Sequence, residues 1–243
     1  MNIKKERLPK EKFSQLVKAS LKKRKQVEYL EIIDDQIFNN QFSEALTIIT
    51  KAKHLFPENK QFLHREADIC FQQEKYAKAG AIYSLLNEEA NTSKKSFCIA
   101  VKLINENLIN EALPIINKLI KNRENELSSR AYSLLADIAF LEKDYKKMYR
   151  KAREGVKRNP FLTSLIDKFF LSIVLTNYYK RSIPFFEKVL DDNPYSDKAW
   201  LYAGKAYQAA GFELKAIECF ELAYDTNPNL KEAKNLLKEV RGY

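Results

Sequence analysis

The side chains best suited to acid–base chemistry or metal ligation are two histidines and three cysteines. Neither His54 nor His64 has a cysteine or carboxylate at the spacing of an HExxH or CxxC motif. Cys70, Cys98 and Cys219 are isolated, and each falls within a helical pattern as a small hydrophobic residue would. The five glycines are also isolated, so the sequence lacks a glycine-rich phosphate loop. These patterns predict no catalytic site, no metal and no cofactor, and therefore a protein that is not an enzyme.

Positive charge is concentrated at the N-terminus. Residues 1–26 contain ten basic and two acidic side chains, whereas residues 27–243 contain 32 basic and 30 acidic ones. Such a segment attracts phosphates, anionic lipids or acidic protein surfaces, although a charged terminus can also serve solubility alone. We define residues 1–25 as the basic arm and expect it to be partly helical. Its expected contact residues are Lys18, Lys22, Lys23, Arg24 and Lys25.

Composition and targeting patterns favour a helical protein of the cytoplasm. The 243 residues include 5 glycines and 7 prolines, a scarcity that disfavours short strands with tight turns and favours long helices. Three cysteines without a pairing pattern indicate a reducing compartment. The sequence has no run of 18 apolar residues and no signal-peptide pattern. We therefore expect a cytoplasmic location and no integral membrane segment.

Equivalent residues, small at five positions and Met at position 148, recur along the chain at a nearly constant spacing. They lie at positions 45, 79, 112, 148, 182 and 216, so the successive steps are 34, 33, 36, 34 and 34 residues. Pro160, Pro194 and Pro228 are also 34 residues apart and end the later units, because proline cannot continue a helix. This period predicts a stack of similar units, each built from two helices.

The last unit has the clearest pattern. One face of its first helix carries residues spaced i, i+3, i+4 and i+7, namely Trp200, Ala203, Gly204 and Tyr207. After a turn at Gly211, a second stripe follows: Ala216, Phe220 and Ala223. Residues 197–230 resemble the tetratricopeptide repeat (TPR), a 34-residue helix–turn–helix. Roughly 217 of the 243 residues share this resemblance, although Glu66 stands where the family has Leu.

The resemblance implies an all-α fold, a right-handed superhelical TPR solenoid of about six helix–turn–helix repeats with a C-terminal capping helix. The basic arm is followed by the expected repeats 26–59, 60–92, 93–128, 129–162, 163–196 and 197–228, and residues 229–243 form the cap. A polar-backed terminal helix covers the open hydrophobic end of such an array. We therefore expect the chain to be complete at its C-terminus.

In this family the first helix of each repeat lines a concave groove that binds peptides. The corresponding positions here give an apolar and acidic groove formed by Leu30, Asp34, Phe38, His64, Asp68, Phe71, Phe97, Val101, Arg130, Asp137, Phe140, Asp167 and Leu171. Such a groove suits a protein or peptide segment with apolar and basic residues. The competing interpretation is that the aromatics pack between repeats and the aspartates are solvated. Leu30, Asp34, Phe97 and Val101 replace the carboxylate clamp of chaperone-tail binders, which argues against that ligand.

The expected function is a non-enzymatic scaffold or adaptor that holds a partner protein segment in this groove. The alternative is a nucleic-acid- or ribosome-associated factor acting through the basic arm, although no set of base-stacking aromatics accompanies the arm. Attachment of the arm to a membrane surface is a third interpretation, weakened by its short apolar face. The charges also fit a homo-oligomer in which the arm of one molecule occupies the groove of another, or an arm folded into its own groove.

Overall fold

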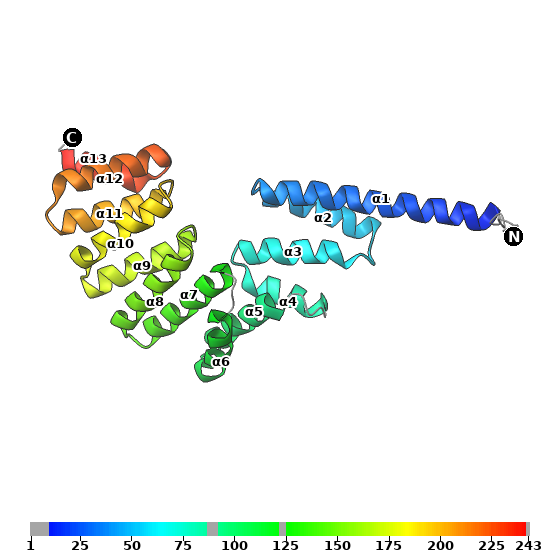
Figure 1. The fold of residues 1–243 in the computed structure, drawn as a ribbon, viewed down its shortest axis with the longest axis horizontal. Helices are drawn as coiled ribbons and strands as arrows, with labels where there is room; N and C mark the ends of the chain where they lie inside the picture. Colours follow the sequence, from blue (N-terminus) through cyan, green and yellow to red (C-terminus); the bar gives the residue numbers. More distant parts are fainter. Residues whose placement is uncertain (1–9, 87–91, 122–124, 242–243) are drawn as a thin grey trace, which may run out of the picture. The chain divides into compact units, whose positions relative to one another are not determined.

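The structure is a computed structural model that describes residues 10–86, 92–121 and 125–241. Within these ranges every regular element is an α-helix (Figure 1). The chain divides into two compact units, residues 1–98 and residues 99–243. The expected all-α class is confirmed.

The first unit contains two helix pairs and the beginning of a fifth helix. Its helices are α1 (Lys10–Phe38), α2 (Phe42–Leu55), α3 (Lys60–Gln72), α4 (Tyr76–Leu86) and the start of α5 (Thr92–Asn105). Helix α1 packs on α2, and α3 packs on α4 and on both helices of the preceding pair. The core between α1, α2 and α3 is built from Ile33, Ile49, Phe56 and Phe62 together with small alanines.

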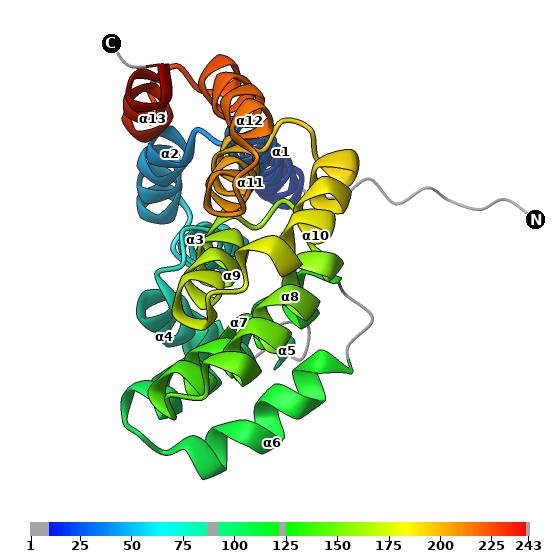
Figure 2. The ribbon, with the colours of Figure 1, turned by 90° about the vertical axis from the view of Figure 1, so that its left-hand side faces the viewer.

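The second unit continues the alternation of first and second helices. It contains the end of α5 and then α6 (Ile109–Ile120), α7 (Asn125–Leu141), α8 (Tyr145–Arg158), α9 (Thr163–Thr176), α10 (Tyr179–Asp192), α11 (Asp197–Ala209), α12 (Glu213–Thr226) and α13 (Lys231–Arg241). Helices α7, α8 and α9 lie side by side (Figure 2), and α9 also contacts α11. Over the described residues the chain therefore forms six helix pairs and a last single helix, as the repeat pattern predicts.

The same left-handed turn joins the two helices of every pair. One residue in each turn has a positive φ between 56° and 83°, and these residues are Asn40, Glu74, Asn107, Lys143, Asn177 and Gly211. Each lies five positions before the recurring residue at 45, 79, 112, 148, 182 or 216. The amide of the next residue bonds to a carbonyl of the preceding helix, as in Gln41 N–H to Gln36 O at 2.8 Å. The constant turn explains the constant period, because it fixes where every second helix begins.

Helix α1 is longer than the repeat requires. It starts at Lys10, so the boundary expected between the arm and the first repeat, at residue 26, lies inside a continuous helix. From residue 18 to residue 25 every side chain is exposed, whereas Ile33 is buried and Tyr29 and Leu30 pack against the core. The basic side chains between residues 18 and 25 therefore project into solvent from a regular helix. Residues 1–9 of the arm lie outside the described residues.

Candidate functional site

In the first unit, the expected groove aspartates form ion pairs with the next first helix. Arg65 of α3 donates two hydrogen bonds to Asp34 of α1, from Nε to Oδ1 at 2.9 Å and from Nη2 to Oδ2 at 2.8 Å. Lys94 of α5 lies 2.7 Å from Oδ1 of Asp68 in α3, and the Tyr83 hydroxyl donates to the same oxygen at 2.7 Å. Both carboxylates thus have a cation supplied by the protein.

In the second unit the pattern repeats. Lys168 of α9 donates to Oδ2 of Asp137 in α7 and to the hydroxyl of Ser133, each at 2.7 Å. Lys198 of α11 lies 2.5 Å from Oδ2 of Asp167 in α9. We call Asp34, Asp68, Asp137 and Asp167 with their cations the aspartate ladder. Because each carboxylate is paired, a basic partner segment would have to displace a lysine or arginine to reach it.

Three expected groove residues are buried instead. Phe71 and Phe97 are 2% and 1% exposed, and their rings meet edge to face at a centroid distance of 5.4 Å. Tyr76 completes this aromatic cluster at 5.0 Å from Phe97. Arg130 is also buried, and its Nε lies 3.2 Å from Glu126 on the same helix. The two rings hold α3 and α5 together, and all three buried side chains leave little surface for a ligand, so we remove them from the candidate site.

The remaining expected residues differ in their exposure. Phe38 is 87% exposed at the end of α1, whereas Leu30, His64 and Val101 are half-buried. Phe140 and Leu171 are 43% and 42% exposed, which is high for large apolar side chains. In the second unit, therefore, the apolar part of the expected groove is accessible.

An apolar ridge runs over the ends of α7 and α9. Its exposed members are Phe140, Leu141, Leu171, Val174 and Leu175. Phe140 and Val174 are one 34-residue period apart, as are Leu141 and Leu175, so they occupy equivalent positions in consecutive repeats. The Asp137–Lys168 ion pair joins the same two helices. Several large apolar side chains exposed at equivalent positions of neighbouring repeats are typical of an interaction surface.

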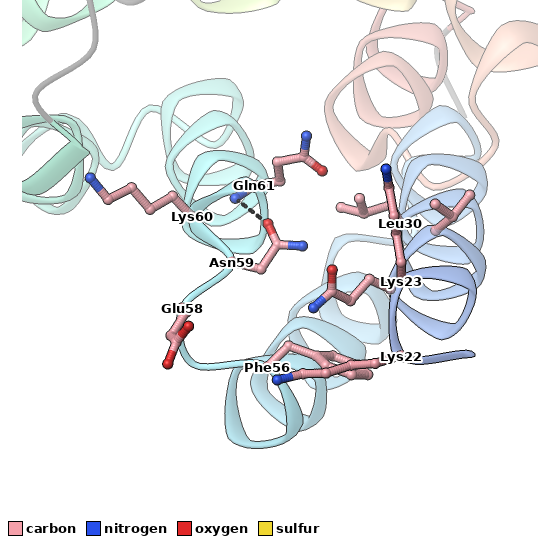
Figure 3. Close-up of a pocket in the computed structure, with 10 residues that line it drawn as sticks. Lys22, Lys23, Leu30, Phe56, Glu58, Asn59, Lys60 and Gln61 are labelled. Atoms are coloured by element: carbon pink, nitrogen blue, oxygen red, sulfur yellow. Dashed lines mark hydrogen bonds between the residues drawn. The ribbon is translucent and has the colours of Figure 1, made fainter. Parts of the chain in front are cut away.

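A separate cleft of about 550 Å³ lies in the first unit, where α1 extends past the turn between α2 and α3 (Figure 3). It is lined by Lys22, Lys23, Gln26, Val27, Leu30, Phe56, Glu58, Asn59, Lys60 and Gln61. In Figure 3, the Asn59 side chain accepts a hydrogen bond from the backbone N–H of Gln61 at 3.0 Å.

This cleft brings together residues that the sequence placed in two different sites. Lys22 and Lys23 belong to the expected basic arm, whereas Leu30 belongs to the expected groove. Phe56 and Lys60 were not expected to contribute, because Phe56 ends a second helix and Lys60 begins the next repeat. The lining combines apolar side chains with three lysines and one glutamate, a combination suited to an acidic segment with an apolar anchor.

Pairing with two lysines explains why Glu66 replaces the leucine of the repeat pattern. Its carboxylate lies 2.7 Å from Lys53 of α2 and 3.0 Å from Lys78 of α4. Burial tends to raise the pKa of Glu66, but the hydrogen bonds from both lysines outweigh burial and lower that pKa below its ordinary value of 4.5.

The lowered pKa of Glu66 predicts a pH-dependent contribution to stability. A carboxylate whose pKa is lower when folded stabilises the protein above its unfolded pKa, and this contribution is lost as the pH falls through the folded pKa. We expect Glu66→Gln to reduce the unfolding free energy by about 1 kcal/mol at neutral pH and by much less near pH 3. Urea denaturation at both pH values measures the difference, and Glu31→Gln on exposed α1 is the control. An equal loss at both pH values would contradict the ion-pair explanation.

Solved structures of similar fold were found, whereas no protein-family model and no curated protein matches the sequence. A tetratricopeptide repeat protein from Parabacteroides merdae has a TM-score of 0.58 and 18% identity, covering 89% of this chain and 84% of its own. Cut9 in the APC/C hetero-tetramer Cut9–Hcn1 has a TM-score of 0.60 and 14% identity, covering 88% of this chain and 42% of that chain. PilF of Pseudomonas aeruginosa has a TM-score of 0.53 and 11% identity, covering 90% of this chain and 99% of its own.

At these identities the likeness concerns the fold. The chain has the fold of tetratricopeptide repeat proteins, an all-α solenoid of helix pairs, as its repeat pattern predicts. In the described ranges no helix combines the length and apolarity that a membrane-spanning segment needs. Nor do three or more His, Cys, Asp or Glu side chains of the described part come together as metal ligands.

Proposed function

We propose that this protein is a non-catalytic scaffold that binds a segment of a partner protein on the surface formed by its first helices. The apolar ridge over α7 and α9 is the observation that carries this proposal. Its side chains stay exposed although the cores of both helices are well packed, and burying them against a partner would remove apolar area from water, which favours a complex. Solvent-exposed apolar side chains at repeating positions suit an extended or helical ligand.

The partner segment we propose is apolar where it meets the ridge. Basic residues in it would lie close to the aspartate ladder, but they gain little there because Lys168 and Lys198 already neutralise the carboxylates. In the first unit, the cleft beside Phe56 favours acidic residues next to an apolar anchor. The free, buried cysteines support a reducing location such as the cytoplasm, and burial raises the pKa of Cys98 to about 12.

The alternative proposal is a nucleic-acid- or ribosome-associated role through the basic arm. It is supported by the exposure of Lys18, Lys22, Lys23, Arg24 and Lys25, of which Arg24 pairs with Glu28. Because Lys22 and Lys23 also line the cleft, an acidic peptide and a polyanion would compete for them.

A pull-down from native lysate with quantitative mass spectrometry tests the scaffold role. The ridge variant is Phe140→Ser/Leu171→Ser/Val174→Ser, used after circular dichroism has shown that its helices are intact. We expect discrete proteins that bind the wild type in nuclease-treated lysate to be lost or reduced about tenfold with the ridge variant, because truncating central apolar contacts removes most binding energy.

A matched control removes the same number of exposed apolar side chains elsewhere. Leu85, Phe161 and Leu214 are all more than half exposed and lie outside the first helices. Leu85→Ser/Phe161→Ser/Leu214→Ser should retain the same proteins. If both variants keep every partner, or if both lose them equally, the ridge is not the binding surface. Loss of every partner on nuclease treatment would instead favour the alternative role of the arm.

A further inference from the structure

Helix α8 holds the excess positive charge of the second unit. Its 14 residues include seven basic and one acidic side chain, whereas the rest of residues 99–243 includes 17 basic and 18 acidic ones. The net charge of residues 27–243 taken together does not show this concentration, because acidic residues in other segments offset the basic residues of α8. The second unit is therefore close to neutral except for one strongly cationic helix.

Four of these cations form a straight line on the outer face of α8. Lys146, Arg150, Arg153 and Lys157 are spaced i, i+4, i+7 and i+11, and all four are exposed. At 1.5 Å per residue the line is about 16 Å long. The opposite face, which includes Met148, Ala152 and Val156, is buried between neighbouring helices. We call these four residues the cationic stripe.

The stripe is held out toward solvent and is not neutralised by the protein. Among the described residues no carboxylate forms an ion pair with any of its four members, in contrast to the aspartate ladder. The Arg153 guanidinium lies over the ring of Phe185 in α10, 4.9 Å from its centroid. Beside the stripe, Arg158 lies over Tyr132 of α7 at 4.9 Å. These ring contacts fix the position of two guanidinium groups while leaving their edge N–H donors available.

We propose that the cationic stripe binds the phosphate backbone of a nucleic acid. Protein–protein interfaces have a desolvated core with aromatic and apolar anchors, but every exposed side chain of α8 is Lys or Arg. Nucleic-acid interfaces are more polar and much more positively charged. The line of about 16 Å is long enough to contact several successive phosphates of one strand. Without exposed aromatics or apolar side chains, the stripe binds the backbone independently of base sequence and does not insert into a membrane.

This site differs from both surfaces discussed above. It lies on a second helix, away from the apolar ridge on the first helices, and it is 120 or more residues after the basic arm in sequence. An experiment that excludes nucleic-acid binding by the stripe would therefore leave the scaffold role intact. Likewise, loss of the scaffold role would leave the stripe proposal intact.

Fluorescence anisotropy with the full chain and a labelled RNA of about 20 nucleotides tests the proposal. The stripe variant is Lys146→Glu/Arg150→Glu/Lys157→Glu, which keeps Arg153 and its contact with Phe185. We expect the wild type to bind the RNA and the stripe variant to bind at least about tenfold more weakly. The slope of log K against log salt should fall by about 2, because three phosphate contacts are lost at about 0.7 each.

Two controls make the same change in net charge at other places. Lys231→Glu/Lys234→Glu/Lys238→Glu alters exposed lysines of α13 and should change the RNA affinity by less than about twofold.

The second control, Lys18→Glu/Lys22→Glu/Lys23→Glu, alters the basic arm and should weaken binding less than the stripe variant does. The proposal is wrong if the wild type does not bind RNA, or if the α13 variant weakens RNA binding as much as the stripe variant. It is also wrong if the arm variant is the only one of the three that weakens RNA binding. Stripe-dependent binding of poly-L-glutamate without RNA binding would also overturn it and would indicate an acidic protein partner.

Discussion

Phe169→Ala should destabilise the second unit by about 3–5 kcal/mol, the loss typical of truncating a fully buried phenylalanine. The ring is 0% exposed at the centre of the core between α8, α9 and α10. It contacts Tyr149 at a centroid distance of 5.3 Å, Phe185 at 5.0 Å and Phe186 at 5.4 Å. Removing it leaves a cavity where two consecutive repeats meet, and repeat arrays depend on such nearest-neighbour interfaces.

Urea denaturation followed by circular dichroism measures this loss. Phe161→Ala is the matched control, because Phe161 precedes the same helix but is mostly exposed, and we expect a change within about 0.5 kcal/mol. We also expect the Phe169→Ala transition to broaden or split, since weakening one interface reduces the coupling between repeats. A loss below about 1 kcal/mol would show that the ring is not a central contact of this core.

The helix pairs were predictable from the sequence because their signals are local. The 34-residue period reflects the left-handed turn, and Asn or Gly occupies that turn residue in four of the six pairs. Glu74 and Lys143 occupy it in the other two pairs, where composition gives no such signal. The length of α1 was not predictable from the period, because its N-terminal part lies outside any repeat.

The candidate groove was only partly predictable, because its chemistry depends on pairing between repeats. Three rungs of the aspartate ladder join an acidic residue to a cation 31 residues later, such as Asp137 to Lys168. That spacing is one helical turn short of the repeat period, so the two side chains meet across neighbouring first helices. A search at 31 residues would have found these rungs. Assigning the aspartates to a ligand by position alone overlooked their internal partners.

The exposure of the aromatic groove residues could not be predicted for a different reason. Phe71 and Phe140 occupy similar places in their first helices, yet Phe71 is buried by Tyr76 and Phe97 while Phe140 is exposed. Position within the repeat predicts which face a side chain occupies, but neighbours from other helices decide how much of it remains accessible. The cationic stripe of α8 was missed for a similar reason. Its i, i+4, i+7 spacing is visible in the sequence, but a net charge summed over residues 27–243 hides a local excess of basic residues.

Gly204→Ala should reduce stability by about 1–3 kcal/mol, although alanine is the better helix former by about 1 kcal/mol. A Cβ at position 204 of α11 would lie 2.5 Å from Cε1 of Phe220 and 3.2 Å from the carbonyl oxygen of Ala216, both in α12. Phe220 is fully buried and cannot move aside, so α11 and α12 would have to separate. Thermal and urea denaturation of the full chain measure the cost.

A double-mutant cycle with Phe220→Leu separates crowding from other causes. Leucine is smaller than phenylalanine and makes room for the new methyl group, so the two substitutions together should cost less than the sum of their separate losses. Gly211→Ala is the control, because no atom lies within 4 Å of a Cβ there and its φ of +83° makes the cost purely one of backbone strain, about 1 kcal/mol. Its effect should add to that of Phe220→Leu without coupling. If Gly204→Ala is also additive with Phe220→Leu, close approach of α11 and α12 is not the reason for glycine at position 204.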